Sequence, residues 1–76
     1  MEQRSRSIGQ SMKLCRVARG IRVEELAERS GVSKATIYHS EKDLTYPGVL
    51  VLTALADVLG VSLDEYIGRR RPGRKP

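Results

Sequence analysis

The residues that could do chemistry in this chain are few, and they favour charge-based binding over catalysis. The 76 residues include one His, one Cys, and 14 Lys and Arg. No pair of nucleophile and base, no set of metal ligands and no phosphate-binding glycine loop can be assembled from them. A single Cys also cannot form an internal disulfide. The sequence therefore predicts a protein that is not an enzyme, with no cofactor, no metal and no evident small-molecule ligand.

Positive charge is unevenly distributed along the chain. The net charge is +5, but residues 69–75 alone carry five Arg and Lys. Between Ile8 and Ile67, seven Lys and Arg stand against eight Asp and Glu, and all seven basic residues lie at or before Lys42. A surface polarised in this way orients a protein on a polyanion, although a solvated mixed surface explains the pattern equally well.

Apolar residues with helical periodicity, punctuated by glycines, predict an all-α fold of five helices. The expected helices run from Ser7 to about Arg19, about Val23 to Ser30, about Lys34 to Glu41, about Gly48 to Leu59, and Ser62 to Gly68. Capping boxes open the first and last of them. We expect one domain over residues 8–68, a polar arm over 1–7 and a disordered basic tail over 69–76. The absence of a long apolar run predicts no membrane segment and a cytoplasmic location.

The connection between the second and third expected helices is the most informative one. Only Gly31, Val32 and Ser33 separate the two helices, which forces them to cross at a steep angle. Leu26, Ala27, Val32 and Ile37 are spaced to fill that angle. The geometry is that of a helix-turn-helix, although a short corner in an ordinary helical domain has the same spacing.

The stretch from Val23 to Glu41, VEELAERSGVSKATIYHSE, resembles the helix-turn-helix of the phage repressor and Cro family, whose regulators are also called XRE-like. The resemblance extends over about sixty residues. It includes Ile8, Gly9, Met12, Cys15, Arg16 and Ile21 before the motif, and Pro47, Val49, Leu52, Leu55, Ala56, Leu59, Gly60 and the VSLDE segment at 61–65 after it. It implies a compact five-helix domain that binds double-stranded DNA as a transcriptional regulator in the cytoplasm, associated with the nucleoid.

The resemblance also implies roles for individual residues, with the third helix in the major groove. Base-reading positions are Lys34, Ala35 and His39, and backbone-contacting positions are Arg22, Ser33 and Thr36. The side chains suit these roles, because Lys donates to guanine or phosphate and Ala packs on a thymine methyl. The alternatives are a solvated charge for Lys34 and a passive surface residue for His39.

Two further features concern how the third helix is held. The resemblance implies a largely buried salt bridge between Arg16 and Glu41. Three positions depart from the family pattern: Arg22 replaces a Ser or Thr cap, Val23 replaces a Gln that clamps phosphate, and Ser40 replaces a large apolar residue. The small Ser40 predicts looser packing behind the third helix.

The fourth helix is apolar nearly all round, which predicts a homodimer on a pseudo-palindromic operator. Its expected core stripe is Val49, Leu52, Leu55, Ala56 and Leu59, and its expected dimer face is Leu50, Val51, Ala54 and Val58. The alternative is a few scattered exposed aliphatic residues. Because one fold serves several functions, the rival function is a coactivator-like protein-interaction adaptor.

Overall fold

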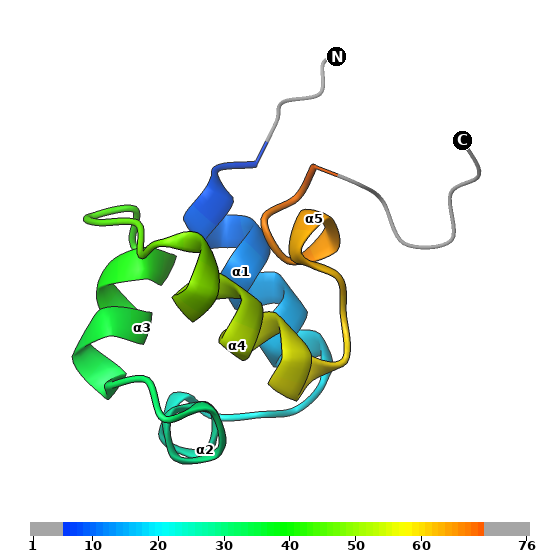
Figure 1. Cartoon of the computed structure of the whole chain (residues 1–76). Coiled ribbons are helices and arrows are strands. Elements are labelled where there is room, and N and C mark those ends of the chain that lie inside the picture. Colours follow the sequence, from blue (N-terminus) through cyan, green and yellow to red (C-terminus); the bar gives the residue numbers. More distant parts are fainter. Residues whose placement is uncertain (1–5, 70–76) are drawn as a thin grey trace.

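The computed structural model describes residues 6–69, in which helices are the only regular secondary structure (Figure 1). Its five helices are α1 (Ile8–Ala18), α2 (Val23–Ser30), α3 (Lys34–Glu41), α4 (Val49–Leu59) and α5 (Leu63–Tyr66). The predicted all-α class and the helix-turn-helix of the second and third helices are confirmed. The expected arm and tail lie outside the described residues, apart from positions 6, 7 and 69.

Local capping chemistry explains where the helices start and stop. Ser7 forms a complete capping box with Gln10 at the start of α1, and Ser62 caps α5 by accepting a hydrogen bond from the backbone N–H of Glu65. Gly31 and Gly60 end α2 and α4 in the left-handed conformation that glycine adopts without strain. These helix ends are therefore encoded by residues next to them in the sequence.

The core lies where α1 and α4 meet the other helices. Met12, Leu26, Ile37, Leu55 and Tyr66 are fully buried there. Helix α1 packs on α3 and α5, while α2 packs on α3 and α4. Leu26 and Ile37 fill the angle between α2 and α3 as expected, and together these contacts fix the direction of α3 relative to the rest of the domain.

Helix α4 departs from its expected burial pattern at its first turn. Val49, which was expected in the core stripe, is 59% exposed, whereas Leu55, Ala56 and Leu59 are buried. The buried positions all lie in the C-terminal half of α4, so its first turn extends beyond the core. Periodicity therefore identified the buried residues in the C-terminal half of α4, but it missed the exposure of Val49 and placed Val51 and Val58, which pack on the core, on the opposite face.

The contact between α1 and α3 is tighter than the sequence indicates. A Cβ atom placed on Gly9 would lie 2.6 Å from the backbone oxygens of both Ser40 and Glu41. Ser40 is fully buried, and its hydroxyl donates a 2.7 Å hydrogen bond to the carbonyl of Thr36. The expectation of loose packing behind α3 is wrong, because a glycine on α1 lets the two backbones approach until the space beside a small Ser40 is filled.

No helix in the described range 6–69 is long and apolar enough to cross a membrane.

Candidate nucleic-acid interface

Helix α3 has one buried face and one outward face. Ile37, Ser40 and Glu41 are buried against the domain. The exposed residues of α3 and its caps are Ser33, Lys34, Ala35, Tyr38, His39 and Lys42. All three expected base-reading residues therefore lie on one exposed surface, and Tyr38, which sequence reasoning left out, lies among them.

The first turn of α3 is organised by two hydroxyl groups. The Ser33 hydroxyl accepts a 3.1 Å hydrogen bond from the Thr36 backbone N–H, and it lies 2.9 Å from the Thr36 hydroxyl. This arrangement occupies one hydroxyl proton and leaves the other available to an acceptor outside the protein. Ser33 and Thr36 are thus paired at the end of α3 where the backbone N–H groups of Lys34 and Ala35 begin the helix.

Arg22 lies at the opposite end of α2 from Ser33. It occupies the N-cap position of α2, and its side chain makes no capping hydrogen bond. The side chain is exposed. The replacement of a capping Ser or Thr by Arg therefore leaves the α2 cap unmade and places a cation at the surface instead.

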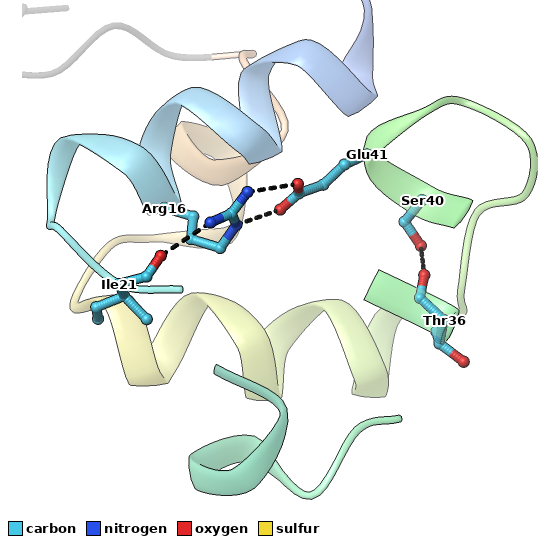
Figure 2. Close-up of polar contacts among 5 residues, drawn as sticks. All are labelled: Arg16, Ile21, Thr36, Ser40 and Glu41. Carbon is cyan, nitrogen blue, oxygen red and sulfur yellow. Dashed lines mark hydrogen bonds and ion pairs between the residues drawn. The ribbon is translucent and has the colours of Figure 1, made fainter. Parts of the chain in front are cut away.

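A buried ion pair joins α1 to the end of α3 (Figure 2). Arg16 donates to both carboxylate oxygens of Glu41, at 2.7 Å through Nε and at 2.9 Å through Nη2. Its Nη1 donates to the carbonyl of Ile21 at 2.9 Å, which ties the loop before α2 to the same guanidinium. The hydrogen bonds with Glu41 raise the pKa of Arg16, so the guanidinium stays charged.

The ion pair also sets the charge of the outward face of α3. Glu41 is the only acidic residue in α3, and Arg16 neutralises it inside the domain. The exposed side of the helix carries Lys34 and, at its C-terminal cap, Lys42. The solvent-facing side of α3 is therefore positive, as a surface that contacts a polyanion needs to be.

A second attachment of α3 to α1, which the sequence did not reveal, is centred on Asp43. Its carboxylate accepts hydrogen bonds from the Ser7 hydroxyl at 2.6 Å, the Gly9 backbone N–H at 2.8 Å and the Tyr46 hydroxyl at 2.7 Å. These hydrogen bonds hold the pKa of Asp43 below its usual range. We call this group the Asp43 clasp. It fastens the loop after α3 to the first turn of α1, where a negative charge is favourable.

The only sequence signal for the clasp is the residue type at its centre. Asp43 has a φ of 62°, and it is the one residue other than glycine in the described range with a positive φ. Asp adopts this left-handed conformation more readily than most residues, so an Asp just after a helix is a candidate terminator. Nothing nearby in the sequence identifies its partners at Ser7 and Gly9.

Comparison with known proteins places this arrangement in a family. The family model described as Helix-turn-helix, HTH_3, matches residues 12–66. The chain belongs to the HTH_3 family. The function class of this helix-turn-helix family is DNA-binding transcription regulation and not enzyme catalysis. No curated protein gives a significant sequence match.

Several solved HTH_3-type structures share the fold. The biofilm regulator SinR in complex with DNA is 38% identical with a TM-score of 0.70, over 74% of this chain and 90% of that chain. The N-terminal DNA-binding domain of SinR from Bacillus subtilis is 31% identical with a TM-score of 0.74, and the match covers 88% of this chain and 96% of that chain. An HTH_3 family transcriptional regulator from Vibrio cholerae is 27% identical with a TM-score of 0.74. The match covers 82% of this chain but only 35% of that longer chain.

Proposed function

We propose that this chain is a sequence-specific double-stranded DNA-binding protein that regulates transcription, with α3 in the major groove. The observation that carries the proposal is the outward face of α3, where Lys34, Ala35 and His39 are exposed while Arg16 neutralises the only acid of the helix. A major groove accommodates one α-helix and offers donors, acceptors and thymine methyl groups along its floor. The similarity to SinR, whose structure includes DNA, supports the same proposal.

The side chains divide into two roles in this proposal. Lys34 donates to guanine or to a nearby acceptor, Ala35 packs on a thymine methyl, and His39 donates or accepts at a base edge. Ser33, Thr36 and Arg22 contact the sugar-phosphate backbone and set the depth and angle of α3. The free hydroxyl proton of the Ser33 and Thr36 pair is suited to a phosphate oxygen.

The test of base reading is Lys34→Ala. We expect affinity for an operator selected from random DNA to fall by about 1 to 3 kcal/mol, with preference relaxed at one base pair per half-site. Lys13→Ala is the matched control, because Lys13 is an exposed lysine on α1 and its loss removes the same charge. Equal losses on operator and unrelated DNA in a titration would assign Lys34 to phosphate contact instead of base reading.

We further propose that the protein acts as a homodimer on a pseudo-palindromic operator. The four expected dimer residues differ in how much surface they could offer to a partner. Leu50 is 83% exposed. Val51, Ala54 and Val58 are half-buried, and Val51 and Val58 pack on the core. Leu50 is one of four exposed apolar residues that lie close together in the sequence before and at the start of α4, with Leu44, Tyr46 and Val49, and we call these four residues the α4 entry patch.

The α4 entry patch suits pairing between two copies of the chain. Its members are 69%, 52%, 59% and 83% exposed, in the order Leu44, Tyr46, Val49 and Leu50. Large exposed apolar side chains that gather on a surface mark interaction sites in many soluble proteins, and we propose that these four residues do so here. Helix-turn-helix dimers place their two recognition helices at half-sites about 10 bp apart, and we propose that two-fold pairing through this patch does the same.

Replacing Leu50 with Asp tests this pairing. Because Leu50 contributes little to the core, we expect the fold to be kept and the dimer dissociation constant to rise more than about tenfold. Sedimentation over a concentration series gives this constant, and Leu14→Asp is the matched control, since Leu14 is 48% exposed on α1. A wild-type protein that sediments only as a monomer at tens of micromolar, or equal effects of both variants, would contradict the proposed interface.

The second candidate function is a protein-interaction adaptor. One structural relative is a SinR and SinI protein complex, 32% identical with a TM-score of 0.75 over 90% of this chain. The adaptor proposal rests on this example and on the exposed α4 entry patch. A sequence-selective shift of duplex DNA at near-physiological salt favours DNA binding, and the absence of any such shift favours the adaptor.

A further inference from the structure

Tyr38 is the large side chain in the middle of the outward face of α3. At 3.6 residues per turn, it lies about 40° around the helix from Lys34 and about 60° from Ala35, on the arc between them. It is 42% exposed, although the neighbouring Ile37 is fully buried. Tyr38 therefore stands between two residues expected to face bases, one turn further along the helix from Lys34.

The three tyrosines of the chain differ in burial and in their hydrogen bonds. The hydroxyl of Tyr46 donates to Asp43, and Tyr66 is fully buried in the core. In the described part of the chain, Tyr38 makes no side-chain hydrogen bond and is not a member of the core cluster. No hydrogen bond in the described range ties the Tyr38 hydroxyl to the rest of the domain, so its exposed ring edge is available to a partner.

We propose that Tyr38 is a specificity-determining residue that reads a thymine through contact of its ring with the 5-methyl group. This inference rests on the proposed function, because it requires α3 to lie in the major groove. The thymine methyl is the one apolar feature of the major-groove edges, and apolar side chains contact it there. An aromatic ring that is half-exposed in the free protein has apolar surface left to bury against such a group.

The neighbours of Tyr38 support a base contact over a backbone contact. Lys34 and Lys42 lie four residues before and after it, so the two lysines flank the ring along one row of the helix surface. Lys34 is a proposed base reader, and Lys42, at the C-terminal cap of α3, presents a compact charge that suits a phosphate oxygen. The ring between them has no charge to offer a phosphate, and its larger apolar area is better matched to the floor of the groove.

The experiment uses the operator selected from random duplex DNA and replaces each thymine in turn with uracil, which removes only the methyl group. For the wild-type chain, at least one replacement should weaken binding by roughly three- to fivefold, the effect of one buried methyl. Tyr38→Ala should bind the parent operator roughly tenfold more weakly and no longer distinguish thymine from uracil at that position. Tyr38→Phe keeps the ring and should keep the distinction.

Comparison within each variant makes the result independent of how much protein is folded. The ratio of affinities for the thymine and uracil duplexes is the readout, and a thermal melt of Tyr38→Ala checks that the domain is intact. Lys42→Ala is the matched control on the same row and should weaken all duplexes alike without changing any ratio. The inference is overturned if Tyr38→Ala keeps every ratio, or if Tyr38→Phe loses the same ratio as Tyr38→Ala.

The outcomes also separate this inference from the proposed function. If Lys34→Ala relaxes specificity while Tyr38→Ala keeps every ratio, α3 reads DNA without Tyr38. If no operator can be selected and neither variant changes binding to duplex DNA, the proposed function fails and this inference fails with it.

Discussion

Replacing Glu41 with alanine is expected to lower the free energy of unfolding by about 3 to 5 kcal/mol. The side chain of Arg16 is only 11% exposed, and Glu41 supplies partners for two of its nitrogens at 2.7 and 2.9 Å. Without Glu41, the buried guanidinium of Arg16 would keep only one of the hydrogen-bond acceptors seen in residues 6–69, the carbonyl of Ile21. For a domain of this size the melting temperature should fall by more than about 12 °C.

Two further variants show whether the loss comes from an unpaired buried charge. Glu25→Ala breaks an ion pair with Arg29 in which both side chains are about half exposed, 49% for Glu25 and 52% for Arg29. This change should lower the free energy of unfolding by less than about 0.5 kcal/mol. The double variant Arg16→Met with Glu41→Leu should recover much of the stability, since it removes both charges. A Glu41→Ala protein that melts within a degree of the wild type would show that the pair contributes nothing.

Replacing Gly9 with alanine is expected to lower the free energy of unfolding by about 2 to 3 kcal/mol, through overpacking. The sign is informative, because in an unobstructed helix the same change stabilises by about 0.5 to 1 kcal/mol. Here the added Cβ would lie 2.6 Å from two backbone oxygens of α3, so α1 and α3 would have to separate. Chemical denaturation of both proteins measures the difference.

Gly48→Ala is the matched control for this substitution. Gly48 lies at the N-cap of α4, has a negative φ of −68°, and has no atom within 4 Å of an added Cβ. The control should cost less than about 1 kcal/mol, the loss of a tolerated cap residue. Equal effects at Gly9 and Gly48, or a more stable Gly9→Ala protein, would mean that the close contact of α1 with α3 does not constrain the fold.

Features encoded by neighbouring residues could be predicted from the sequence. The bounds of α2 and α3 were predicted correctly because Gly31 and Ser33 act on the helix ends beside them. The outward positions of Lys34, Ala35 and His39 on α3 came from the family resemblance, which also supplied their roles, and it did not include Tyr38. The Arg16 and Glu41 pair also depended on that resemblance, since nothing local connects residues 25 positions apart.

Features that depend on how far elements extend, or on distant partners, could not be predicted. The periodicity of α4 identified Leu55, Ala56 and Leu59 as buried, but the exposure of Val49 and the packing of Val51 and Val58 on the core depend on where the other helices cover α4. The small side chain of Ser40 leaves no gap, because Gly9 lets the backbone of α1 come close to it. This contact between two helices can be found only when the fold is known. The partners of Asp43 lie 34 and 36 positions away and were missed for the same reason.

The Asp43 clasp makes the stability of the contact between the first turn of α1 and the loop after α3 depend on pH. Because the pKa of Asp43 is lowered in the fold, unfolding takes up a proton in the pH range between the folded and unfolded values. The stabilisation is complete above the usual aspartate range and is lost as the pH falls through the lowered pKa. The same carboxylate holds the hydroxyl of Tyr46, a member of the α4 entry patch. Protonation would thus weaken, through one group, the hydrogen bonds that hold the start of α1 and the hydroxyl of Tyr46.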